Sequence, residues 1–231
     1  MEINAEKIKL MTNNTSGINT ENKVNGQKLE TVTSFKYLGS VITDEGSKPE
    51  ILYRIAQATA ALTRLKPVWI DKSISLSSKM RLMRSLVASI FLYACESWTL
   101  RAELQRRIQA EEMRCYSKIL NISYKDHVTN EEVCAKIQQA TGPYQDLLTI
   151  VKRCKLRWYD HVSRSLGLAK PILRGRVKGG RRRARQRKRL EDNIREWTGM
   201  EIGKSQRAVE NRKKWRKLVA KLSVVPQRPS R

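Results

Sequence analysis

Positive charge concentrated in the last third of the chain is the feature that most constrains its fold. Residues 151–231 carry 27 of the 47 Lys and Arg side chains but only 6 of the 22 Asp and Glu side chains. Within them, residues 174–189 read RGRVKGGRRRARQRKR, with ten basic residues in sixteen and no acid. Such a run cannot bury enough apolar surface to build a core, so we expect it to be disordered until a polyanion binds. Nucleic acid is the usual polyanion for a chain of net charge +25.

The composition of the whole chain is nevertheless that of a folded protein. Hydrophobic residues make up 40% of it, which is enough to bury a core. No stretch approaches twenty apolar residues, and the N-terminal MEINAEKIKL lacks a secretory signal pattern, so we expect neither a membrane span nor a signal peptide. The four cysteines form no CxxC pair and are expected to be reduced thiols: Cys95, Cys115, Cys134 and Cys154.

The apolar patterning predicts a mainly α fold with a small N-terminal β hairpin, a helical thumb-like bundle and a basic, partly disordered C-terminal region. Residues 28–42 read KLETVTSFKYLGSVI, which is typical of β structure, and a turn signal follows. Residues 48–120 predict three helices, the first kinked or ended by Pro67 and the second starting near Ser75. Short connections between them favour an antiparallel three-helix bundle.

The second half predicts shorter helices. Thr129 followed by Glu132 is a capping-box pattern that opens a short helix. The next helix reaches about Val162, and its predicted apolar face holds Leu147, Val151, Cys154 and Trp158, opposite Lys152, Arg153, Lys155 and Arg157. Two short amphipathic helices follow the basic run, with Trp197, Trp215 and Leu218 as a small hydrophobic core. The chain therefore divides into segments 1–46, 47–120, 121–166 and 167–231.

No catalytic or metal-binding pattern stands out. The chain contains no GxSxG, P-loop, HExxH or DxD motif. Its adjacent acidic pairs, such as Glu111–Glu112, point about 100° apart on a helix and are expected to lie on the surface. Zinc is disfavoured because no tight Cys pair accompanies the scattered candidates Cys115, His127, Cys134, Cys154 and His161.

Two segments are candidates for contact with nucleic acid. Residues 155–159, KLRWY, interleave cations that suit phosphates with aromatic rings that stack on bases. A core position for Trp158 with solvated cations around it is the alternative. The basic run fits phosphate binding, nuclear import or both, and a solvated linker is the alternative. If six of its cations contact duplex phosphates, log K should fall against log[salt] with a slope of about −5. The candidate residues are Lys155, Arg157, Trp158, His161, Arg174, Arg176, Lys178, Arg181, Arg182, Arg183, Arg185, Arg187, Lys188 and Arg189.

Motifs in the first hundred residues resemble a known family. INAEKIKLM at residues 3–11 is similar to the INxxKTKLM stretch near the end of a polymerase palm, and FKYLGS at 35–40 to a primer-grip hairpin. RIAQA at 54–58 looks like the opening of a thumb, and LYACESWTL at 92–100 is similar to LYGCETWTL. In order and spacing these resemble the C-terminal part of reverse transcriptases from non-LTR (LINE-type) retrotransposons of the RTE/BovB kind.

The resemblance continues to the C-terminal end. KLRWYDHV at residues 155–162 is similar to KLRWFGHV, and residues 180–199 are similar to GRRxRGRQRKRWEDNIxEWTG. NRKKWRKLV at 211–219 looks like DRxxWRxLV. The departures include Asp160 for Gly and Leu190 for Trp.

The resemblance implies a palm remnant, a thumb and a nucleic-acid-binding region of an RNA-directed DNA polymerase. Tyr37 and Gly39 would help to position the primer end, within a primer-grip-like segment of Phe35, Lys36, Tyr37, Leu38 and Gly39. The family's polymerase uses palm aspartates that hold Mg²⁺, and the chain contains no Asp-Asp pair, so we expect no polymerisation and no cofactor in these residues.

The expected partners are RNA, DNA or both, with no membrane and no small-molecule substrate. The basic run favours the nucleus over the cytoplasm. Two alternatives stay open: a domesticated nuclear nucleic-acid-binding protein, and a helical scaffold whose basic tail serves only nuclear import.

Overall fold

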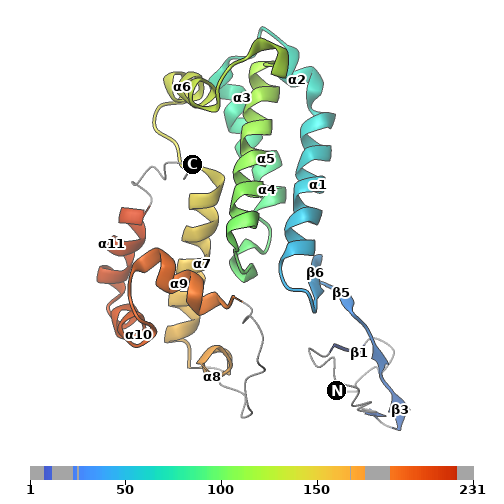
Figure 1. Cartoon of the computed structure of the whole chain (residues 1–231), viewed down its shortest axis with the longest axis vertical. Helices are drawn as coiled ribbons and strands as arrows, with labels where there is room; N and C mark the ends of the chain where they lie inside the picture. The colour runs from blue at the N-terminus through green and yellow to red at the C-terminus, as the bar shows by residue number, and fades with distance from the viewer. Residues whose placement is uncertain (1–7, 12–22, 25, 167, 175–187, 223–231) are drawn as a thin grey trace.

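A helical bundle with a small β hairpin at one end forms the body of the protein (Figure 1). The structure is a computed structural model and describes residues 8–11, 23–24, 26–166, 168–174 and 188–222. The mainly α fold with a small N-terminal β region is confirmed. We expected a β hairpin in segment 1–46, and the hairpin of β5 (Ser34–Tyr37) and β6 (Ser40–Thr43) lies in that segment.

Within the described residues, the strands pair two by two. β5 and β6 are antiparallel, with Phe35 opposite Ile42. β1 (Lys9–Leu10) lies parallel to β4 (Glu30–Thr31), and β2 (Lys23–Val24) is antiparallel to β3 (Gln27–Lys28). Such short pairs bury little surface, so the hairpin depends on the helices beside it for its position.

Three helical segments make the bundle, as predicted. α1 (Lys48–Arg64) ends just before Pro67, which lies at the start of the short α2 (Lys66–Ile70). The second segment begins at the N-cap Ser75 and comprises α3 (Leu76–Leu82), a π turn at Met83–Val87 and α4 (Ala88–Phe91). The third is α5 (Ala102–Leu120). Their facing side chains are fully buried and include Ile51, Leu62, Met80, Phe91 and Ile108.

Side-chain caps fix the helices that follow. The short 3-10 turns η3 (Cys95–Ser97) and η4 (Tyr124–Asp126) flank α5. The predicted capping box of Thr129 and Glu132 is present and opens α6 (Asn130–Thr141). Asp146 caps α7 (Leu147–Arg164) by accepting a hydrogen bond from the Thr149 N–H at 2.5 Å. Each cap satisfies backbone donors that the helix itself leaves free.

The C-terminal helices pack on α7 and share its core. After α8 (Ala169–Arg174), the chain forms α9 (Leu190–Thr198), α10 (Ile202–Glu210) and α11 (Arg212–Leu222), where we expected two helices. Gly199, with φ of +66°, ends α9 and separates it from α10. Trp197 and Trp215 are buried as predicted, but they belong to the same hydrophobic cluster as the bundle. The Trp215 indole N–H also donates to the Leu156 carbonyl of α7 at 3.1 Å.

The buried face of α7 differs from the predicted one. Lys155 and Tyr159 are buried, while Cys154 and Trp158 are only half-buried. The helix is covered on two sides, by the bundle and by α9–α11, so its buried arc is wider and turned relative to the apolar stripe. The prediction that Lys155 lies on the solvated face is therefore wrong.

Candidate nucleic-acid interface

The primer-grip-like segment forms the tip of the β5–β6 hairpin. Leu38 and Gly39 are the two turn residues, and both have positive φ, +47° and +83°. Positive φ at both positions matches a primed two-residue turn, whose twist suits a hairpin. Lys36, Tyr37 and Leu38 are exposed, whereas Phe35 is half-buried. The turn thus presents an aromatic ring, an aliphatic side chain and a cation to solvent.

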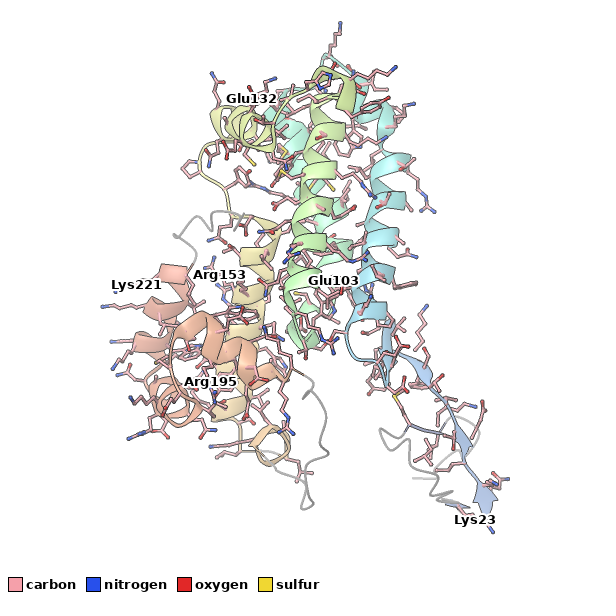
Figure 2. All side chains as sticks on the ribbon, in the orientation of Figure 1. Lys23, Glu103, Glu132, Arg153, Arg195 and Lys221 are labelled. Atoms are coloured by element: carbon pink, nitrogen blue, oxygen red, sulfur yellow. The ribbon has the colours of Figure 1, made fainter. Side chains whose placement is uncertain are left out.

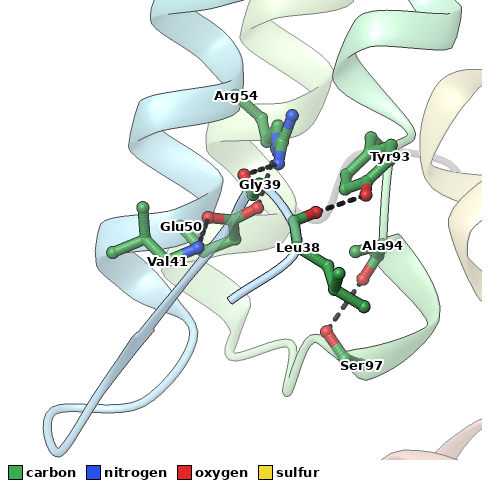
Figure 3. Close-up of polar contacts among 8 residues, drawn as sticks. All are labelled: Leu38, Gly39, Val41, Glu50, Arg54, Tyr93, Ala94 and Ser97. Atoms are coloured by element: carbon green, nitrogen blue, oxygen red, sulfur yellow. Dashed lines mark hydrogen bonds and ion pairs between the residues drawn. The ribbon is translucent and has the colours of Figure 1, made fainter. Parts of the chain in front are cut away.

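A buried ion pair ties this turn to α1 (Figure 3). The Glu50 carboxylate is 2% exposed and accepts from the Val41 N–H at 2.6 Å and from Arg54 Nε at 2.7 Å. Arg54 Nη2 donates in turn to the Gly39 carbonyl at 2.5 Å. Because both charges are paired and bonded to hairpin backbone, the pair fixes where the turn lies.

Tyr93 holds the turn from the other side. It follows α4, and its hydroxyl donates to the Leu38 carbonyl. The Arg54 guanidinium lies 4.4 Å from the centre of the Tyr93 ring, within range of a cation–π interaction. The hairpin tip is therefore fixed by two elements of the bundle, and the side chain of Leu38 remains 75% exposed.

A cavity of about 700 Å³ opens beside the hairpin. Tyr37 and Leu38 of the hairpin line it, together with Tyr93, Ala94 and Trp98 of the segment that follows α4. The Trp98 indole N–H is buried and finds no hydrogen-bond acceptor among the described residues. Serine and threonine residues and the acidic residues Glu50 and Glu96 complete the lining, so the space suits an uncharged base or sugar better than a phosphate.

The KLRW segment is divided between the interior and the surface. Lys155 is fully buried, and its ammonium donates to the Trp98 carbonyl and, at 3.3 Å, to the Glu96 carbonyl. Burial lowers the pKa of Lys155 to about 7. Its donors are engaged inside the protein, so Lys155 holds η3 to α7 and is not accessible to a phosphate. Arg157 and His161 are exposed and Trp158 is half-buried.

Most of the predicted basic run lies outside the described residues. This holds for Arg176, Lys178, Arg181, Arg182, Arg183, Arg185 and Arg187. Arg174 ends α8. Lys188 forms an ion pair with Glu196, and Arg189 is exposed at the N-cap of α9. The described end of the run, Lys188 and Arg189, therefore leads directly into α9 and the packed C-terminal helices.

A second cationic region was missed in the sequence. Six of the eleven residues of α11 are Lys or Arg, none is acidic, and all six are exposed. Two exposed cations of α10 add to them, and in Figure 2 side chains project outward from these helices, with Lys221 labelled. This α10–α11 cationic surface consists of Lys204, Arg207, Arg212, Lys213, Lys214, Arg216, Lys217 and Lys221. The sequence does contain a signal for this surface, because the buried apolar residues of α11 recur on one helical face and its six cations lie outside that face.

Comparison of the chain with protein-family models, with curated proteins and with solved structures finds no match. No helix within the described residues is long and apolar enough to cross a membrane. No group of three or more His, Cys, Asp or Glu side chains there is arranged to hold a metal ion.

Proposed function

We propose that the chain binds nucleic acid, as a fragment of a reverse-transcriptase-type protein that holds template and primer without polymerising. The observation that carries this proposal is the α10–α11 cationic surface. Its eight cations are all exposed, and α11 contributes six of them without an acid. Like charges gathered on one rigid surface repel each other, and a polyanion relieves that repulsion.

The dimensions of α11 suit a nucleic-acid backbone. A helix of eleven residues is about 16 Å long, and duplex DNA carries a charge about every 1.7 Å along its axis. One helix can therefore lie along several phosphates. Buried Trp215 and Val219 anchor the opposite face, so the cations are presented by a helix whose position is fixed. Fixed cations lose less conformational entropy on binding than those of a free tail.

The hairpin supplies a different kind of contact. Its tip presents Tyr37 and Leu38 beside the cavity, and neither brings a charge. In the reverse transcriptases that the chain resembles, this segment is the primer grip. We therefore assign Tyr37 and Gly39 to positioning a primer end, and the cations of α10 and α11, together with the basic run at residues 174–189, to holding the nucleic-acid backbone. Since the 231 residues contain no Asp-Asp pair, these residues are assigned binding and no phosphoryl transfer.

Fluorescence anisotropy of the whole chain tests this function. Single-stranded RNA, duplex DNA and an RNA–DNA hybrid are titrated at several salt concentrations between 50 and about 200 mM. We expect binding whose logarithmic affinity falls with log[salt] at a slope of about −3 or steeper, because several phosphates are neutralised at once. A preference for the hybrid would support the primer-end role. Absence of binding at 50 mM salt would contradict the proposed function and favour a helical scaffold with an import signal.

A further inference from the structure

The charge of the cavity beside the hairpin is opposite to that of the chain as a whole. Lys and Arg make up 47 of the 231 residues, yet none of those in the described part of the chain lines this cavity. Its lining includes two glutamates, Glu50 and Glu96, and three aromatic residues. The cationic helices α10 and α11 suit phosphates, whereas this cavity favours a group that carries no negative charge.

The two glutamates of the cavity have different partners. Glu50 is 2% exposed, and its carboxylate is paired with Arg54 at 2.7 Å. Glu96 lies in η3 and is half-buried, and its carboxylate accepts no hydrogen bond from another described residue. The buried Lys155 ammonium donates to the backbone carbonyls of Glu96 and Trp98 instead. Glu96 therefore keeps acceptor sites for a ligand with hydroxyl or amino donors, and such bonds to a carboxylate are charge-assisted.

Aromatic rings supply a stacking surface in the same cavity. Tyr37 is 56% exposed and Tyr93 is 46% exposed, and both line it. Leu38 and Ala94 also line it, and both have left-handed backbone, with φ of +47° and +56°. Figure 3 shows these two residues next to Tyr93. Strained backbone at non-glycine residues is concentrated at binding sites, which agrees with a ligand site here.

The charge of the cavity restricts which part of a nucleic acid enters it. An internal nucleotide carries a phosphate on each side, and no cation of the lining would offset their repulsion from Glu96. The last nucleoside of a strand with a free 3′-hydroxyl carries a phosphate only on its 5′ side, and this phosphate stays outside. In RNA that nucleoside presents neighbouring 2′- and 3′-hydroxyls, and a carboxylate accepts hydrogen bonds from such groups.

We propose that the cavity binds the 3′-terminal nucleoside of an RNA strand, with Glu96 accepting from its ribose hydroxyls and Tyr37 stacking on its base. This inference rests on the proposed function and narrows it, because it names an RNA end and not a DNA end as the preferred terminus. A deoxyribose terminus brings one donor fewer to Glu96. Losing a hydrogen bond to a charged acceptor should weaken binding about tenfold.

Anisotropy of the full chain with duplexes that differ in one terminal sugar tests the proposal. A labelled template strand with a blocked 3′ end is paired with a shorter DNA strand, and only the last nucleotide of the shorter strand is varied. It is a ribonucleotide, a 2′-deoxynucleotide, a 2′-O-methyl nucleotide or a 2′-deoxynucleotide with a 3′-phosphate. We expect the ribonucleotide terminus to bind about tenfold tighter than the deoxy and 2′-O-methyl termini. The 3′-phosphate should bind most weakly, because Glu96 repels it.

Substitution of Glu96 assigns the preference to the cavity. Glu96→Gln keeps the size of the side chain but removes its charge, so the ratio of ribo- to deoxy-terminus affinity should fall from about ten to about two or less. Affinity for the deoxy terminus should change little. Glu45→Gln is the matched control, because Glu45 is exposed in the turn after β6 and is not among the lining residues. It removes the same charge and should keep the ratio of the parent chain.

The outcomes separate this inference from the proposed function. Equal affinity of the parent chain for ribo and deoxy termini would overturn the inference, while binding of both duplexes would still support the proposed function. A ribonucleotide preference that persists in Glu96→Gln, or that disappears equally in Glu45→Gln, would also overturn it. Absence of binding to all four duplexes at low salt would overturn the proposed function and this inference together.

Discussion

The side-chain amide of Asn193 pairs with both backbone groups of Leu100. Asn193 Oδ1 accepts from the Leu100 N–H at 2.9 Å, and Asn193 Nδ2 donates to the Leu100 carbonyl at 2.8 Å. Both residues are fully buried. Leu100 precedes α5 and Asn193 lies in α9, so these two bonds connect the bundle to the helices that follow the basic run.

Replacing this amide should loosen that connection. Asn193→Ala leaves a buried N–H and a buried C=O without partners, and we expect the free energy of unfolding to fall by about 3 kcal/mol. Asn211→Ala is the control, because the Asn211 side chain accepts the Lys214 N–H at an exposed helix start, and loss of that bond should cost about 1 kcal/mol. Urea unfolding measures both. Equal costs for the two variants would contradict a role of Asn193 in joining the helices.

Glu112 should make stability depend on pH. The expectation that Glu111 and Glu112 lie on the surface is wrong, because both are buried on the face of α5 that packs on other helices. The Glu112 carboxylate accepts from the Tyr116 hydroxyl at 2.6 Å and the Leu147 N–H at 3.0 Å, and burial raises its pKa from 4.5 to about 7. The native state therefore holds a proton that the unfolded chain releases at lower pH. The contribution of Glu112 to the free energy of unfolding should fall as pH rises from about 4.5 to 7, by an amount of order 3 kcal/mol.

Two substitutions test this assignment, and they should change the free energy of unfolding in opposite directions. Glu112→Gln keeps an acceptor for both bonds but cannot ionise, so stability at pH 8 should rise and the slope between pH 5 and 7 should flatten. The Glu132 carboxylate is exposed, and hydrogen bonds from Thr129 lower its pKa, so its stabilisation is present at neutral pH and lost on acidification. Glu132→Gln should therefore destabilise at pH 7 and change little at pH 3. A Glu112→Gln variant with the wild-type pH profile would show that another group titrates.

Leu38 should lower the stability of the chain and strengthen its binding to nucleic acid. A leucine at φ of +47° is strained, and its side chain is 75% exposed, so packing does not compensate for the strain. Leu38→Asn, which tolerates this conformation, should stabilise the chain by about 0.5–1 kcal/mol and weaken binding of an RNA–DNA hybrid. Gly39→Ala, at φ of +83°, should instead destabilise it. Thermal unfolding and affinity for the RNA–DNA hybrid, measured on the same samples, test both predictions. A Leu38→Asn variant with unchanged affinity would remove Leu38 from the interface.

Local patterns in the sequence predicted the helices well. The capping box at Thr129, the start at Ser75 and the break near Pro67 all depend on residues within a few positions of one another. Their effects are local, so one sequence suffices to read them. The π turn at Met83–Val87 was not predicted, because one extra residue in a helical turn hardly changes the apolar spacing.

Contacts between distant residues could not be predicted in the same way. The helical pattern predicts Lys155 on the solvated face because it lies opposite the apolar stripe, whereas the acceptors that allow its burial are the distant carbonyls of Glu96 and Trp98. The hydrogen bond from Arg54 to Gly39 likewise depends on how the hairpin packs on α1. The cations of α11 were visible in the sequence, but their common exposure became clear only once Trp215 was placed in the core.

The α10–α11 cationic surface carries the central proposal, and neutralising α11 tests it most directly. In one variant Arg212, Lys213, Lys214, Arg216, Lys217 and Lys221 become Gln. In a matched control six exposed cations on the bundle, its connecting turns, η4 and α6 become Gln: Lys66, Lys72, Arg81, Lys118, Lys125 and Lys136. The two variants have the same net charge. Circular dichroism first checks that both fold.

Salt-dependent anisotropy with duplex DNA and RNA–DNA hybrid then compares the two variants with the parent chain. We expect the α11 variant to lose at least about tenfold in affinity at 100 mM salt and its salt slope to become shallower by about 2 or more. The control should lose no more than about threefold, since its charges act only at long range. Equal losses in both variants would show that net charge alone drives binding, and would contradict a nucleic-acid interface on α10 and α11.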